Sequence, residues 1–344
     1  MYSLKRGLVK GLGLGVLLLV ALAFPRFSGS EYYVHLANMV GISVILIMSL
    51  NLLFGYTGQV SVGHAAFYAI GAYTTAFMMA RLQWPFWIGV PASFATAGLA
   101  GALLGLPCLR LRGYYLAMAT LGFAVVVYVI LQQWQPLTGG AMGIIGIPRP
   151  KLFDFTFSNE SSYYYLVLVA TLFTFVVIRN IVASPAGRAM VAIRESETAA
   201  EALGVDITKY KMLAFTVSAG LAGLAGSLFA PLSRFVSPDG FTLIPSIIVL
   251  SMLIIGGLGS HLGAILGGIL MVLLPELIGF VGEFRVFVYS ICLVLVIIFM
   301  PEGLAGMIHH LLGLGKGKLK LAGLAPRAAP VAESLGRPAK GGGA

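Results

Sequence analysis

The sequence contains few charged residues. Asp, Glu, Lys and Arg make up 10% of its 344 residues, whereas hydrophobic residues make up 59%. A soluble protein of this length needs more polar surface than that to cover its core. The composition therefore excludes a soluble globular fold and indicates a polytopic membrane protein. The apolar runs also lack the roughly ten-residue alternation of an outer-membrane barrel, so we expect an all-α fold.

Carboxylates are scarce within the apolar runs. All twelve Asp and Glu residues lie in predicted loops, in the carboxyl-terminal tail or near predicted span ends. Glu276, beside Pro275, is the one marginal candidate for a group within the membrane. Carriers driven by protons or sodium usually need an ionisable or coordinating group at that depth. The pattern therefore argues against an ion-coupled secondary transporter, which is the main alternative function. A membrane scaffold without transport activity is a second alternative.

Signatures of nucleotide, metal and disulfide sites are also missing. The glycine- and lysine-rich stretch Gly313–Lys318 lacks the spacing and the Ser or Thr of a phosphate-binding loop. His309 and His310 lack the spacing of a zinc-binding helix. Cys108 and Cys292 have no partner near in sequence and should pack as small core residues. We therefore expect no enzyme activity, no metal site and no cofactor bound by this chain.

The apolar runs are long enough to cross the membrane as helices, which takes about 20 residues. We expect about ten transmembrane helices (8–10), at residues 8–25, 34–54, 65–80, 87–107, 114–134, 163–181, 212–232, 242–259, 263–280 and 286–300. With the amino terminus inside, most of the 22 Lys and Arg residues fall on the cytoplasmic face. Both termini are therefore expected in the cytoplasm. The net charge of +10 suits anionic membrane lipid rather than nucleic acid.

The chain divides into three expected parts. Residues 1–33 hold a basic amino terminus and the first helix, residues 34–312 form the transmembrane domain, and residues 313–344 form a basic tail with the composition of a disordered segment. The first apolar run ends in Ala21-Leu22-Ala23, which is also typical of a secretory signal and its cleavage site. Cleavage of that run is an alternative that leaves the orientation of the other spans unchanged.

The one long charged stretch between spans is at residues 184–211. Ser184 followed by a proline predicts the start of a helix. Thr198 and Glu201 have capping-box spacing, and Gly204 is predicted to end the short helix that follows. We expect a short amphipathic helical segment on the cytoplasmic side, where a soluble partner can drive a membrane protein.

Glycine, by contrast, is abundant, with 44 residues. Small residues at three- and four-residue spacing let helices pack closely in lipid, and this is the role expected for most of them. Two clusters, Gly55–His64 and Thr138–Gly143, are mixed with polar residues at expected helix breaks. Irregular backbone at membrane depth is tolerated only where it lines a cavity or is buried in protein. The candidates for a solute path are Asn51, Thr57, Gln59, Ser61, His64, Thr138, Gly139 and Gly140. Alternatively, these groups only hydrogen-bond the interrupted backbone.

A short internal similarity joins two glycine-rich segments. Gly55–Gly71 and Gly256–Gly268 both contain a glycine-rich break followed by a helix of small residues. Internal duplication is common in transporters and would place a pathway between the two halves. Coincidence in a glycine-rich chain is the alternative.

Several motifs, in order, resemble one family. They are Asn51–Tyr73 (NLLFGYTGQVSVGHAAFYAIGAY), Thr138–Pro148 (TGGAMGIIGIP), Arg188–Gly226 and Gly256–Ser260 (GGLGS). Together they are similar to the LivM-type permease subunits of bacterial branched-chain amino acid ABC importers, over nearly the whole chain apart from its first span and tail. The resemblance implies a multi-pass protein of a bacterial or archaeal inner membrane. It would pass branched-chain amino acids, or a related solute such as urea, a short amide or an aromatic acid, into the cytoplasm.

The resemblance also implies partners. These are a second, LivH-type permease, two ATP-binding subunits that hold ATP and magnesium, and a periplasmic binding protein that delivers the solute. In ABC importers the permease contacts the ATPase through a cytoplasmic helix with the pattern E-A-A, three residues, G. This chain keeps the spacing, with Thr in place of Glu and a glutamate one residue early. The implied coupling residues are Glu197, Thr198, Ala199, Ala200, Glu201, Ala202, Leu203 and Gly204.

Overall fold

The computed structural model describes residues 22–27, 29–108, 111, 113–152, 155–277, 291 and 303–311. Its contacts divide the chain into one unit of residues 1–307 and another of residues 308–344. All of the elements named below lie in the first unit except α14, whose residues 308–311 belong to the second. The expected span at 286–300 and the expected tail from residue 313 lie outside the described residues, as does most of the span at 8–25.

The described part of the chain is built almost entirely of helices, which confirms the all-α class. The long helices are α2 (Glu31–Leu50), α3 (His64–Ala80), α4 (Phe86–Cys108), α5 (Tyr114–Gln133), α7 (Glu160–Ala183), α10 (Ile207–Ser233), α11 (Leu243–Gly256) and α12 (His261–Leu277). The short ones are the π-helix η1 (Asn51–Tyr56), α6 (Gln135–Thr138), η2 (Gly140–Met142), α8 (Pro185–Glu195), α9 (Glu197–Ala202), η3 (Pro238–Phe241) and α14 (Gly303–Leu311). Each long helix coincides with an expected span to within a few residues. By length and composition, six described helical stretches can cross a membrane, and α12 is apolar but shorter.

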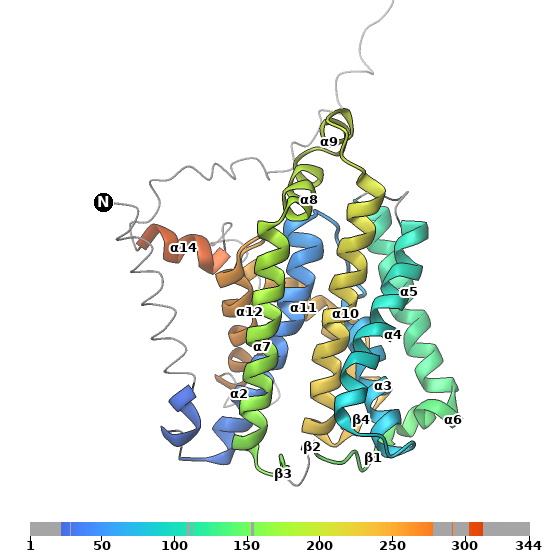
Figure 1. The fold of residues 1–344 in the computed structure, drawn as a ribbon, viewed down its shortest axis with the longest axis vertical. Coiled ribbons are helices and arrows are strands. Elements are labelled where there is room, and N and C mark those ends of the chain that lie inside the picture. The colour runs from blue at the N-terminus through green and yellow to red at the C-terminus, as the bar shows by residue number, and fades with distance from the viewer. Residues whose placement is uncertain are drawn as a thin grey trace, which may run out of the picture. The chain divides into compact units, whose positions relative to one another are not determined.

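Two pairs of very short antiparallel strands, which the sequence did not predict, lie at one end of the helices (Figure 1). β1 (Ile144–Ile145) pairs with β4 (Phe235–Val236), and β2 (Lys151–Leu152) pairs with β3 (Phe155–Thr156). The helices α8 and α9 lie at the opposite end of the same unit (Figure 1). We call these two ends the strand end and the α9 end.

The core is organised around α10, which packs along α3 and α4. Its buried face consists largely of small residues. A Cβ atom on Gly226 would lie 2.1 Å from the backbone oxygen of Tyr68 in α3, and one on Gly101 of α4 would lie 2.4 Å from the Cβ of Ala219. No side chain fits at these crossings, so the glycines set the distance between the helices. This is the packing role that the sequence predicts for most of its glycine clusters.

Basic residues lie in two groups, one at each end of the helices. Arg149, Lys151 and Arg234 lie in or beside the strand pairs, and the backbone oxygen of Arg234 accepts from the N–H groups of residues 146 and 147. Arg188, Arg194, Lys209 and Lys211 lie in α8 and in the first part of α10, at the α9 end.

Candidate functional site

The segment between α7 and α10 folds as the two short helices α8 and α9. α8 begins as the sequence predicts, because Ser184 is its N-cap and Pro185 its first residue. The Ser184 hydroxyl oxygen accepts a hydrogen bond from the backbone N–H of Gly187 at 3.4 Å. This satisfies one of the N–H groups that a helix leaves unpaired at its start.

The start of α9 differs from the expected capping box. Ser196, rather than Thr198, is the N-cap, and its hydroxyl accepts from the backbone N–H of Ala199 at 3.3 Å. The physical reason is that α8 ends at residue 195, which leaves Ser196 in the extended conformation of a cap (φ −163°, ψ 113°) and Thr198 already inside the helix. Gly204 follows α9 with φ +81°, as expected of a glycine that closes a helix.

The eight predicted coupling residues face in different directions. Ala200 is 2% exposed and fixes α9 against the rest of the segment, whereas Leu203 is 83% exposed. Glu197 is half-buried. The remaining members, which are exposed, are Thr198, Ala199, Glu201, Ala202 and Gly204. The outward-facing part of α9 therefore combines one large apolar side chain with small and polar residues at the tip of the α9 end (Figure 1).

Glu197 is held by a residue that the sequence analysis did not single out. Lys211, near the start of α10, is 4% exposed, and its Nζ atom donates to Oε1 of Glu197 at 2.5 Å. A buried ammonium group needs a charged partner, so this ion pair fastens α9 to the long helix α10. The two residues lie on different helices and far beyond the three- or four-residue spacing of side-chain pairs within one helix, so the sequence gave no signal for their contact.

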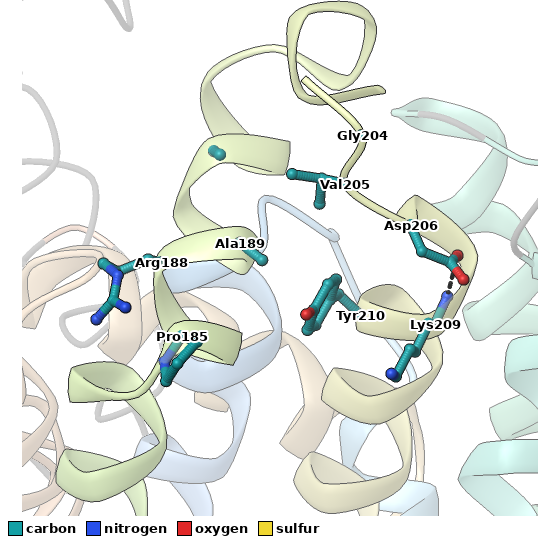
Figure 2. A pocket seen from close by; sticks show the side chains of 9 residues that line it. Pro185, Arg188, Ala189, Gly204, Val205, Asp206, Lys209 and Tyr210 are labelled. Atoms are coloured by element: carbon teal, nitrogen blue, oxygen red, sulfur yellow. Dashed lines mark hydrogen bonds between the residues drawn. The ribbon is translucent and has the colours of Figure 1, made fainter. Parts of the chain in front are cut away.

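A pocket of about 450 Å³ lies between α8 and the start of α10 (Figure 2). It is lined by Pro185, Arg188, Ala189, Ala192, Gly204, Val205, Asp206, Lys209 and Tyr210. Asp206 caps α10 by accepting from the backbone N–H of Lys209 at 3.0 Å. Its walls come from α8, before α9 in the chain, and from residues 204–210, after it. Across the part of the chain that the structure describes, no three His, Cys, Asp or Glu side chains gather as metal ligands would.

The first predicted break is present, and it is buried. The α-helical pattern of α2 gives way to the π-helix η1 at Asn51, and the chain then turns back before α3 begins at His64. The five predicted path residues in this stretch, each at most 4% exposed, are Asn51, Thr57, Gln59, Ser61 and His64. The structure therefore gathers them in one interrupted segment within the protein.

Two of these five residues serve the interrupted backbone. The Asn51 side chain accepts from the N–H of Gly259 at 2.9 Å and donates to the backbone oxygen of Ser260 at 3.1 Å. The Thr57 hydroxyl donates to the backbone oxygen of Leu52 at 3.0 Å. These two side chains therefore fit the alternative that the polar groups only hydrogen-bond the interrupted backbone.

The other three retain unused hydrogen-bonding capacity. Among the described residues, Nε2 of Gln59, Oγ of Ser61 and Nδ1 of His64 are buried without a hydrogen-bond partner. The other ring nitrogen of His64 lies 2.7 Å from the hydroxyl of Ser49. An unpaired buried polar group is unfavourable by about 1–3 kcal/mol, so such atoms favour contact with water or a polar solute. These three side chains are therefore the best candidates for a solute path.

The second predicted cluster is not brought together with the first. The Thr138 hydroxyl donates to the backbone of α5 at 2.7 Å and accepts from the N–H of Gly140 at 3.2 Å. Gly139 and Gly140 have φ values of 78° and 65°, which a tight turn requires. The first break instead contacts α5 at Thr120, whose hydroxyl accepts from Val62 N at 3.0 Å. Thr120 lies roughly 20 Å along α5 from the end that Thr138 follows.

Comparison with known proteins supports a common family. A family model described as branched-chain amino acid transport system / permease component matches residues 32–300. The high-affinity branched-chain amino acid transport system permease protein LivM of Salmonella typhimurium is 38% identical over 88% of this chain and 77% of its own length. The probable LivM of Methanocaldococcus jannaschii is 24% identical over 83% and 91%. LivH of Escherichia coli K12 is 24% identical over 76% and 90%. No solved structure matches the chain.

Proposed function

The chain belongs to the permease-component family of branched-chain amino acid transport systems, as a LivM-type member, and from this premise we propose that it is a membrane subunit of an ATP-driven importer. It receives a small solute from a periplasmic binding protein and passes it to the cytoplasm. Separate ATP-binding subunits hold and hydrolyse ATP with magnesium. Branched-chain amino acids are the proposed solute class, because the relatives are named for that transport.

The proposed membrane partner is a second permease of the LivH type. The chain is similar to both LivM and LivH proteins, which supports a pair of related subunits with the solute path between them. α5 and α7 have long apolar faces that the rest of the described chain does not cover, with Val126 55%, Val169 65% and Phe173 57% exposed. These faces are available to lipid and to the second permease.

The observation that carries the proposal is the construction of α9. Leu203 is 83% exposed at the tip of a short helix, next to a pocket of about 450 Å³. The same helix is fastened to α10 through Glu197 and Lys211. A short helix that presents one apolar side chain suits a groove on a partner protein. We assign that groove to an ATP-binding subunit, because a partner docked on α9 would be connected directly to α10.

This assignment puts the α9 end in the cytoplasm, and we propose the same side for both termini. The basic residues of α8 and of the first part of α10 lie at that end, as the positive-inside rule favours. The opposite, strand end then faces the binding protein in the periplasm. In this orientation the break at residues 51–64 lies toward the cytoplasmic side of the path.

In the proposed cycle, ATP binding closes the two ATP-binding subunits and displaces α9. The ion pair between Glu197 and Lys211 passes the displacement to α10, and the path between the two permeases opens alternately to each side. Gln59, Ser61 and His64 offer hydrogen bonds to the passing solute. Uncharged groups allow a zwitterion to pass without holding it tightly.

The positions of the carboxylates favour ATP over an ion gradient as the energy source. Glu31 and Glu160 lie in the first turns of α2 and α7, and Glu276 lies at the end of α12. Glu160 is also paired with Arg149. Among the described residues, no carboxylate lies in the middle of a long helix, where a coupling ion would need one.

Reconstitution tests the proposal. The chain is purified with the permease and ATP-binding subunits encoded beside it and placed in proteoliposomes with the binding protein and leucine. We expect leucine uptake that requires ATP and persists when ionophores remove proton and sodium gradients. Uptake that needs an ion gradient and proceeds without ATP would establish the alternative, a secondary transporter.

A further inference from the structure

The α8–α9 segment has a second connection to the membrane helices, separate from the ion pair of α9. Arg194, in the last turn of α8, donates a hydrogen bond from Nη1 to the backbone oxygen of Gly55. We propose that Arg194 is a positioning residue that couples this segment to two glycine breaks, at residues 51–59 and 257–260, which together form one joint. We call this structure the glycine joint. The inference rests on the proposed function and deepens it.

Arg194 engages the first break with both its charge and its carbon chain. Gly55 lies near the end of η1, where backbone oxygens lack helical partners and carry partial negative charge. A guanidinium group is a strong donor to such an oxygen. A Cβ atom on Gly58 (φ +75°) would lie 3.2 Å from Cγ and 3.4 Å from Cα of Arg194. The absence of a side chain at Gly58 therefore lets the arginine lie directly on the turn.

The same guanidinium group reaches the second break, between α11 and α12. A Cβ atom on Gly259 (φ +71°) would lie 2.9 Å from Nη1 of Arg194 and 3.2 Å from the backbone oxygen of Gly55. A Cβ atom on Gly55 would lie 2.6 Å from the backbone nitrogen of Gly259. The two breaks are thus in backbone contact, and Arg194 lies where they meet.

Side chains also fasten the two breaks to each other. Asn51 makes two hydrogen bonds across the contact, at 2.9 Å to Gly259 and 3.1 Å to Ser260. The Tyr56 hydroxyl lies 3.4 Å from the ring nitrogens of His261, and the two ring centroids are 5.6 Å apart. The breaks therefore form a single unit. They belong to the two segments with similar sequences, which the fold places side by side.

The glycine joint connects four of the long helices to the α8–α9 segment. The first break connects α2 to α3 and the second connects α11 to α12, and each contains a glycine at positive φ, where the chain can change direction. Gln59, Ser61 and His64 follow Gly58 in the same turn. A movement of Arg194 therefore shifts these path residues, in addition to the movement that Lys211 passes to α10. The joint makes opening of the path depend on the position of α8.

The test compares uptake with ATP hydrolysis in the assembled complex, using leucine and loaded binding protein in proteoliposomes. We expect Arg194→Gln to lower uptake about tenfold, because the charge-assisted hydrogen bond to the joint is lost, while ATP hydrolysis changes less than about twofold. Arg194→Lys keeps the charge and should give an intermediate amount of leucine per ATP. The matched control is Arg81→Gln, which removes an exposed arginine in the turn after α3, at the end of that helix away from the joint, and should leave the ratio unchanged.

A ratio of leucine to ATP in Arg194→Gln equal to that of the wild type would overturn the inference. A parallel loss of uptake and hydrolysis in an assembled complex would also overturn it, since it would indicate a purely structural role. If Arg194→Gln does not assemble, the same criteria are applied to Arg194→Lys.

A second readout does not depend on transport, and so separates failure of the joint from failure of the proposed function. Tyr56→Cys and His261→Cys are combined in a chain whose native cysteines are replaced by serine, and disulfide formation is followed in membranes. The expected result is that adding Arg194→Gln slows disulfide formation about tenfold, because the hydrogen bond that holds the breaks together is lost. An unchanged rate would show that Arg194 does not hold the breaks together, whatever the outcome of the uptake assay.

Discussion

The ion pair between Lys211 and Glu197 should decide whether α9 stays docked on α10. Lys211 is 4% exposed and Glu197 23%, with Nζ and Oε1 2.5 Å apart. Glu197→Gln leaves the buried ammonium group facing a neutral amide. Breaking a buried pair in this way destabilises by about 3–5 kcal/mol, and the partial exposure of Glu197 places the expected value near 3 kcal/mol. Since α9 has only six residues, the loss should appear as local undocking of α9 rather than unfolding of the whole chain.

Undocking can be measured by the reactivity of a buried position. Ala200 is 2% exposed, so a cysteine introduced there, with Cys108 and Cys292 replaced by serine, should react slowly with a water-soluble maleimide in inside-out vesicles. A change of about 3 kcal/mol raises the undocked population roughly a hundredfold, because each 1.4 kcal/mol corresponds to a factor of ten. Glu197→Gln should accelerate labelling by up to that factor.

The double variant Glu197→Gln/Lys211→Met is the control that separates charge from packing. Replacing both members of a buried pair by groups without charge is often neutral, so labelling should return to within a few fold of the parent. The reasoning is refuted if Glu197→Gln labels at the parent rate, or if the double variant labels as fast as Glu197→Gln alone.

Five further substitutions, grouped in three tests, probe the α9 segment, the helix crossing at Gly226 and the solute path. Ala200→Arg and Gly204→Val should each abolish uptake while the chain remains in the membrane. The first overfills a buried position, and the second places a β-branched residue at φ +81°. Uptake above about half of the wild-type rate in either variant would contradict this. Gly226→Val should lower stability by about 3 kcal/mol or more, seen as a reduced melting temperature in detergent, because its Cβ would lie 2.1 Å from a backbone oxygen of α3; an unchanged melting temperature would contradict the close crossing. Gln59→Leu or Ser61→Leu should reduce leucine uptake about tenfold, because hydrogen bonds to the solute are removed, while loaded binding protein still stimulates ATP hydrolysis. Unchanged uptake kinetics in both variants would show that the turn only supports the backbone.

The parts of the fold that the sequence predicts are those with local physical causes. The span expected at 87–107 is α4 (Phe86–Cys108), because the length of an apolar run is set by the thickness of the membrane. Ser184 and Pro185 start α8, and Gly204 follows α9, because caps and closing glycines act within a few residues. The buried break after Asn51 was visible as glycine mixed with polar residues.

The parts that the sequence does not predict depend on contacts between distant residues. Asn51 and Gly259 are 208 residues apart, and nothing in either local pattern indicates that one bonds the other. β1 and β4 have two residues each and pair across a long stretch of chain, so neither has a detectable alternation. The α9 cap was misassigned for a related reason. Both Ser196 and Thr198 are good capping residues, and only the end of α8 decides between them.

The most direct test of the central claim, that an ATP-binding subunit docks on α9, is a crosslink from the tip of that helix. Leu203→Cys is introduced into the otherwise cysteine-free chain, the complex is assembled, and a short bifunctional reagent is added. Leu82→Cys, exposed in the turn that connects α3 to α4, is the control. We expect a crosslink to an ATP-binding subunit from position 203 and none from position 82. A crosslink from position 82 instead, or labelling of position 203 from the periplasmic side of intact cells, would contradict it.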